Sequence, residues 1–133
     1  MACEGESEKA SRLFQAAWDA RRDDYDAAVA AHYLARHQPT PLLVLDWNAR
    51  AVAHFACVTD GRATDLLPSL YLNLADSLLA VGRRAEARVV AERATEHLPA
   101  LRADGYRLFV ASAIARLQER LVENTTDASP GHE

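Results

Sequence analysis

The sequence predicts an all-α fold of antiparallel helix pairs, stacked as a short array of about six helices. Half of the 133 residues are apolar, alanine is the commonest residue, and the chain has only five glycines and five prolines. Alanine is the strongest helix former, whereas glycine and proline interrupt helices. Apolar residues also recur at spacings of three and four, which places them on one face of a helix. We therefore expect one helical domain over residues 7–123, between a flexible N-terminus (1–6) and a disordered polar tail (124–133).

The first half of the chain contains three predicted helices. The first follows Ser7, a good N-cap residue. The second starts at Asp23 or Asp24, whose carboxylates suit a helix N-terminus, and ends before Pro39. The third ends at the Asp-Gly turn that contains Gly61. Apolar residues at helical spacing give the first and third helices a buried face: Ala10, Leu13, Phe14, Ala17 and Trp18, and then Val44, Trp47, Ala51, Val52 and Phe55.

The segment 68–101 is predicted to form two helices that fold back on each other. Leucines at helical spacing share one face of its first helix, and Gly82 follows where a left-handed residue ends a helix without steric cost. The second helix has a narrow face of small residues, which lets two helix axes approach closely, and Pro99 prevents its continuation. That face consists of Ala87, Val90, Ala91 and Ala94.

This segment resembles a tetratricopeptide repeat over its full length. The small residue of the repeat's first helix, its turn glycine, the two alanines of its second helix and its closing proline correspond to Ala75, Gly82, Ala87, Ala94 and Pro99. The sequence departs from the repeat at Leu78 and Ala91, where an aromatic residue is usual. The resemblance implies a superhelical array of helix pairs, with thinner packing between neighbours where the aromatic residues are missing.

Two repeat frames are open for the other helices. One frame pairs residues 24–37 with a helix over residues 43–51, so that the first helix of the chain is an N-terminal cap. The other pairs the first and second helices, because residues 24–28 also resemble the start of a repeat's second helix. A sixth helix, about residues 101–122, continues or closes the array. Its apolar side consists of Tyr106, Phe109, Val110, Ala113, Ile114, Leu117 and Leu121.

Charge and composition argue against nucleic-acid and membrane partners. The formal net charge is −4, and the basic residues are spread along the chain, so no stripe that would follow a phosphate backbone is visible. No segment approaches the roughly 18 apolar residues of a membrane span, and the N-terminus does not resemble a secretory signal. Cys3 and Cys57 are isolated thiols without zinc or disulfide spacing, so we expect a cytoplasmic protein.

No cofactor, metal site or catalytic centre is predicted. His32 and His37 point about 140° apart on a helix, whereas metal ligands on a helix need a spacing of three or four, and His54 adds no such pair. His32 is instead expected to be partly buried and bonded to a carbonyl or carboxylate. Cys57 is expected to be a buried structural cysteine. No phosphate loop or nucleophile motif is visible, so we expect a non-catalytic protein.

The family resemblance implies a candidate peptide groove. Repeats of this kind bind extended peptides on the concave side lined by their first helices, and one subclass clamps a C-terminal carboxylate with asparagine, lysine and arginine. Asn73 and Arg107 match two positions of that clamp, whereas Val29, Tyr33 and Ala103 depart from it, so a groove for a different peptide is expected. The residues expected to line this groove are Tyr33, Arg36, His37, Asn73, Asp76, Tyr106 and Arg107.

The expected function is a non-catalytic interaction module that binds an extended partner segment with at least one acidic group. Arginine suits such a group because it holds a carboxylate through two parallel hydrogen bonds. Two alternatives stay open: a small-molecule or metal sensor that uses the histidine-rich second helix, and a self-associating module in which the same surface buries a second copy as a homodimer.

Overall fold

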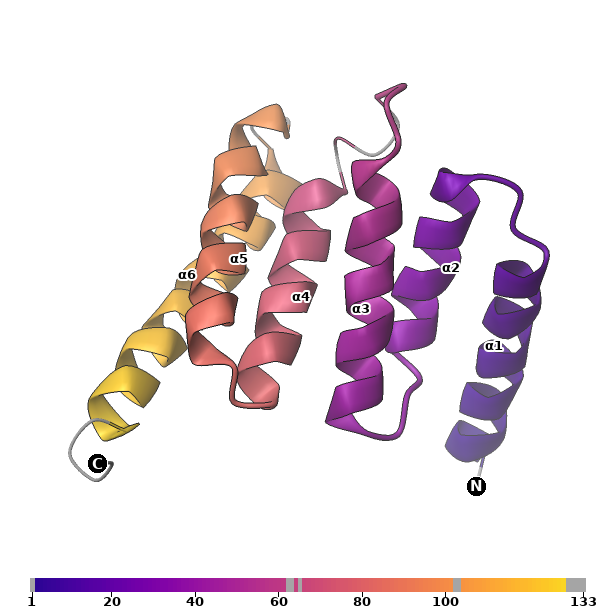
Figure 1. The fold of residues 1–133 in the computed structure, drawn as a ribbon, viewed down its shortest axis with the longest axis horizontal. Helices are drawn as coiled ribbons and strands as arrows, with labels where there is room; N and C mark the ends of the chain where they lie inside the picture. Colours follow the sequence, from indigo (N-terminus) through magenta and orange to yellow (C-terminus); the bar gives the residue numbers. More distant parts are fainter. Residues whose placement is uncertain (1, 62–63, 65, 102–103, 129–133) are drawn as a thin grey trace. The chain divides into compact units, whose positions relative to one another are not determined.

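The computed structural model describes residues 2–61, 64, 66–101 and 104–128, and over these residues it is all-helical with no strand. The predicted all-α class and the packed helix pairs are confirmed. Two compact units divide the chain, Met1–Ala63 and Thr64–Glu133. The elements in chain order are α1 (Ala2–Asp19), α2 (Asp24–Ala35), α3 (Pro41–Ala56), α4 (Leu67–Ala80), α5 (Arg84–His97), the short 3-10 helix η1 (Leu98–Ala100) and α6 (Gly105–Ala128) (Figure 1).

The helices at the two ends of the chain are longer than predicted. α1 begins at Ala2 instead of after Ser7, and α6 continues to Ala128, into the segment predicted to be disordered. Alanine and glutamate near the start of the chain are strong helix formers. At the other end, a helix that is already formed gains one backbone hydrogen bond for each residue added. Residues 1 and 129–133, for which a flexible N-terminus and a disordered tail were predicted, lie outside the described residues.

In the first unit, α2 packs against both α1 and α3. The helix starts agree with the capping rules, because the Asp23 carboxylate accepts a hydrogen bond from the Asp26 backbone N–H (2.8 Å) and the Thr40 hydroxyl accepts one from the Leu43 N–H (3.2 Å). Small residues on α2 let its neighbours approach closely, and its buried set is Ala27, Ala28, Ala30, Ala31, Leu34 and Ala35.

α1 contributes aromatic side chains to the first unit. Phe14 stacks on Tyr33 of α2 with ring centroids 4.9 Å apart, and Trp18 meets Trp47 of α3 edge to face at 5.0 Å. The tryptophans therefore pack between helices, as predicted. Leu13 was expected on this buried face but is 70% exposed. α1 packs through Phe14 and Trp18, which are four residues apart, and Leu13 points about 100° away from Phe14.

In the second unit, α4 and α5 form the predicted helix pair around a tight turn. Gly82 has φ +86°, its N–H donates to the Leu79 carbonyl (3.0 Å), and the Arg83 N–H donates to the Leu78 carbonyl (2.9 Å). These two hydrogen bonds form a Schellman motif, which requires a left-handed residue at the glycine position. The small-residue face of α5 is confirmed, since Ala87, Ala91 and Ala94 are buried.

Substitution of Gly82 by alanine should lower the free energy of unfolding by about 1–2 kcal/mol, because an L-residue is strained in the left-handed conformation. No atom lies within 4 Å of the added Cβ, so backbone strain is the only new cost. Gly105 is the control, since its Cβ would also meet open space and its φ is not positive. Chemical denaturation that shows equal losses for Gly82→Ala and Gly105→Ala would contradict the turn assignment.

α6 packs against both helices of the α4–α5 pair. Its buried row consists of Val110, Ile114, Leu117 and Leu121, which are spaced by three and four. Two predicted members of this face are exposed instead, Tyr106 by 44% and Phe109 by 66%. Phe109 points about 100° away from Val110, outside the strip of α6 that α4 and α5 cover, and Tyr106 lies one helical turn before the first residue of the buried row. Among the helices that the structure describes, none combines the length and the apolar character needed to cross a membrane.

Candidate functional site

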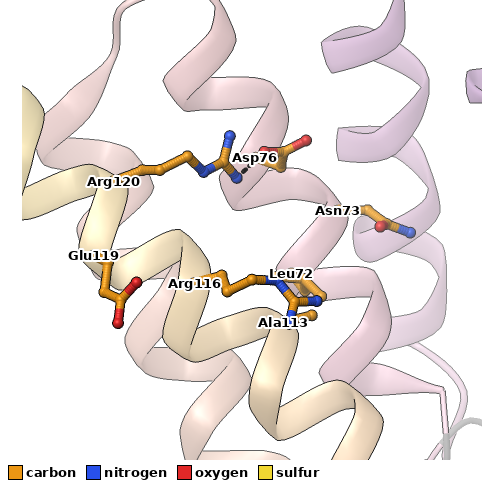
Figure 2. Close-up of a pocket in the computed structure, with 7 residues that line it drawn as sticks. All are labelled: Leu72, Asn73, Asp76, Ala113, Arg116, Glu119 and Arg120. Atoms are coloured by element: carbon orange, nitrogen blue, oxygen red, sulfur yellow. Dashed lines mark hydrogen bonds and ion pairs between the residues drawn. The ribbon is translucent and has the colours of Figure 1, made fainter.

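The second unit contains a pocket of about 460 Å³ between α4 and α6, here named the α4–α6 pocket (Figure 2). Leu72 also packs against the buried cluster of Ala94, Leu101, Val110 and Ile114, so the hydrophobic core supports this wall of the pocket. α4 contributes Leu72, Asn73 and Asp76, and α6 contributes Ala113, Arg116, Glu119 and Arg120.

Two arginines determine the polar character of the α4–α6 pocket. Arg116 and Arg120 are four residues apart on α6, so they share a side of the helix, with about 5–6 Å between their Cβ atoms. In Figure 2 both guanidinium groups extend toward α4, whereas the Glu119 carboxylate does not. A Nη atom of Arg120 donates to Oδ1 of Asp76 at 2.6 Å, and both side chains are about half exposed (54% and 56%).

Arg116 is different, because it forms no hydrogen bond or ion pair with any residue in the described part of the chain. Its guanidinium lies on the pocket wall with five N–H donors, and neither carboxylate of the lining, Asp76 or Glu119, is bonded to it. Asn73 lies on the same pocket wall as Asp76, and its side-chain amide has both a donor and an acceptor. The pocket thus combines a cationic group with a small apolar surface.

Two of the predicted groove residues, Asn73 and Asp76, line the α4–α6 pocket, and two others, Tyr106 and Arg107, do not. The Tyr106 hydroxyl is hydrogen bonded to the Ser69 hydroxyl at 2.6 Å. Arg107 points to the side of α6 opposite Arg116, because nine residues at 3.6 per turn correspond to about 180°.

The α4–α6 pocket thus does not bring Arg107 together with Asn73, and the repeat length explains why the two were paired in the prediction. A tetratricopeptide repeat of about 34 residues relates Asn73 to Arg107. In the structure α6 starts only at Gly105, and its buried row begins at Val110. Arg116 and Arg120 were consequently not predicted, although two arginines spaced by four on the polar side of the last helix were a usable signal.

The remaining predicted groove residues belong to the first unit. Tyr33 stacks on Phe14, and the His37 ring also stacks on Phe14 at 5.9 Å. Arg36 is the exposed C-cap residue of α2. In this unit the aromatic side chain of Phe14 therefore already contacts two of the three predicted residues.

His32 and Cys57 differ from their predicted environments. His32 is partly buried as expected, but its Nδ1 atom has no hydrogen-bond partner in the described structure. Burial lowers the pKa of His32, and the nearby positive charge of Arg36 lowers it further. Cys57 is exposed and not buried, because it caps the C-terminus of α3 after the last helical turn. Oδ1 of Asp24 accepts a hydrogen bond from Nδ1 of His54 at 2.8 Å.

A second, more open pocket of about 410 Å³ lies in the first unit between α1, α2 and α3. Its charged groups already have partners: His54 contacts Asp24, the Arg21 guanidinium lies 4.1 Å from the Trp18 ring, and Arg22 pairs with Asp26. Within the described residues, no group of three or more histidine, cysteine, aspartate or glutamate side chains is arranged to hold a metal ion. The α4–α6 pocket is thus the stronger candidate for ligand binding, because it presents an unpaired charge.

Comparisons of this chain with protein-family models, with curated protein sequences and with solved structures found no match. The geometry and charge of the α4–α6 pocket are therefore the basis for inferring a function. That geometry provides a cation for an acidic group and an apolar wall for a side chain.

Proposed function

We propose that the chain is a non-catalytic interaction module, built as a short tetratricopeptide-like array, that binds an extended peptide segment with an acidic group in the α4–α6 pocket. The observation that carries this proposal is the unpaired guanidinium of Arg116 on the pocket wall. Leu72 on the same wall offers an apolar contact for the rest of the segment.

Several features of the second unit support the tetratricopeptide-like array. The Schellman turn at Gly82 joins α4 to α5, and the small residues Ala87, Ala91 and Ala94 are buried on α5. α6 contacts both α4 and α5, which is how the first helix of a following repeat packs in such arrays. Arrays of this kind present extended surfaces between successive first helices, and α4 and α6 occupy these places in the proposed array.

The charge of the pocket supports an acidic ligand. A guanidinium without a partner keeps all of its donors directed at solvent, and a carboxylate can satisfy two of them in parallel. Hydrogen bonds to charged groups contribute about 1.5–3 kcal/mol, more than neutral ones. The apolar side chain of Leu72 on the same wall can contact a side chain of an extended segment.

Selection of peptides from a random displayed library tests this proposal. The purified chain should enrich peptides with aspartate or glutamate, and Arg116→Ala should weaken binding of a selected peptide roughly tenfold in calorimetric titration, as expected for loss of one charge-assisted hydrogen bond. Arg93→Ala is the matched control, because Arg93 is exposed on α5 and does not line the pocket. It should leave the affinity within a factor of about two.

Two results would contradict the proposal. One is enrichment of peptides without acidic residues, which would leave Arg116 without a role. The other is an equal loss of affinity in Arg116→Ala and Arg93→Ala, which would indicate attraction by overall charge instead of binding in the pocket.

A further inference from the structure

Of the two acidic residues in the pocket lining, Asp76 is the one that forms an ion pair, with Arg120 of α6. It lies on α4, and its Oδ1 atom accepts a hydrogen bond from Arg120 of α6 at 2.6 Å. The pocket therefore contains one neutralised guanidinium, on Arg120, and one unpaired guanidinium, on Arg116. The carboxylates of Asp76 and Glu119 balance the two guanidinium charges, so the formal net charge of the lining is zero and a more highly charged ligand gains no net attraction.

This arrangement affects singly and doubly charged ligands differently. A carboxylate side chain carries one negative charge, whereas a phosphorylated side chain carries about −1.5 to −2 at neutral pH. Arg116 and Asp76 line the same pocket, and the repulsion between charges closer than one Debye length (about 10 Å) is only partly screened. The more highly charged group experiences more of this repulsion and finds Arg120 already occupied.

We infer that Asp76 sets the charge selectivity of the α4–α6 pocket, which accepts a carboxylate and disfavours a phosphorylated side chain. This inference rests on the proposed peptide-binding function and adds to it the class of acidic group that is recognised. Asp76 is thus a specificity-determining residue. Its charge repels the acidic group of the ligand, and its ion pair with Arg120 keeps that guanidinium from binding the ligand.

The test compares two probes on the isotope-labelled full chain by nuclear magnetic resonance. The probes are a short alanine-rich peptide with a central glutamate and its counterpart with a central phosphoserine, both acetylated and amidated so that the acidic side chain is the only charge. The arginine Nε–Hε signals report on binding. The wild-type chain should bind the glutamate peptide more tightly, and Asp76→Asn should shift the ratio of affinities toward phosphoserine by about fivefold, the upper range for one exposed charge interaction.

Two further variants control for charge and folding. Asp46→Asn makes the same change in net charge and also removes an exposed aspartate–arginine pair, with Arg50 at 3.1 Å, but Asp46 lies on α3 in the first unit. It should leave the ratio unchanged. Asp76→Asn combined with Arg120→Gln restores the balance of charge in the pocket and should return the ratio close to the wild-type value.

The outcomes separate this inference from the function on which it rests. If the wild-type chain binds phosphoserine as tightly as glutamate, or if Asp76→Asn leaves the ratio unchanged, the selectivity role of Asp76 is overturned while peptide binding stands. If neither peptide shifts the Arg116 signal in any variant, the proposed function fails and the inference fails with it.

Discussion

Leu117→Ala is expected to lower the free energy of unfolding of the second unit by about 2–5 kcal/mol. Leu117 is completely buried, in the row that α6 presents to the rest of the unit, and it lies between Arg116 and Arg120 of the pocket. Its truncation removes apolar surface that the fold shields from water and leaves a cavity that the neighbouring helices fill only in part. Urea denaturation followed by circular dichroism measures the loss.

Leu108→Ala is the matched control on the same helix. Leu108 is 70% exposed, so the same chemical change should alter stability by no more than about 0.5 kcal/mol. The account of α6 packing is wrong if the two substitutions cost the same, because that would mean that the row from Val110 to Leu121 does not face the core.

Ala94→Leu is expected to destabilise the second unit by about 1–3 kcal/mol through overpacking. Ala94 has no exposed surface and belongs to a buried cluster with Leu101, Val110 and Ile114. A leucine side chain there must push α5 away from α6 or adopt a strained rotamer. Thermal unfolding of the variant should show a clearly lower melting temperature.

The control for this prediction is Ala115→Leu. Ala115 is exposed in the middle of α6, where leucine and alanine have similar helix propensities. This variant should melt close to the wild-type temperature. An unchanged melting temperature for Ala94→Leu would remove the argument that small residues on α5 are required by close helix packing.

The parts of the fold that depend on local signals could be predicted from the sequence. The turn at Gly82 and the small face of α5 are encoded within a few residues, by the left-handed glycine and by alanines at helical spacing. The exposure of Leu13 and Phe109 could not be predicted, because it depends on how wide a contact the neighbouring helices make. Periodicity gives the direction of an apolar face, but the width of the buried strip is set by tertiary packing.

The candidate site was predicted in part for a related reason. Asn73 and Asp76 lie on the predicted first helix of the clearest repeat, and both line the pocket. The residues on the opposite wall depend on the length of the connection between η1 and α6, which determines the residue of α6 that faces Asn73. A fixed repeat length selected Arg107, whereas the start of α6 at Gly105 places Ala113, Arg116 and Arg120 on the pocket wall.

The central claim is that Arg116 holds the acidic group of a bound peptide, and a crystal structure of the chain with a selected acidic peptide tests it most directly. The account predicts a carboxylate oxygen about 2.7–2.9 Å from the Arg116 guanidinium, with the Asp76–Arg120 ion pair retained beside it. A peptide bound elsewhere on the chain, or bound in the α4–α6 pocket with its carboxylate directed away from Arg116, would contradict the account.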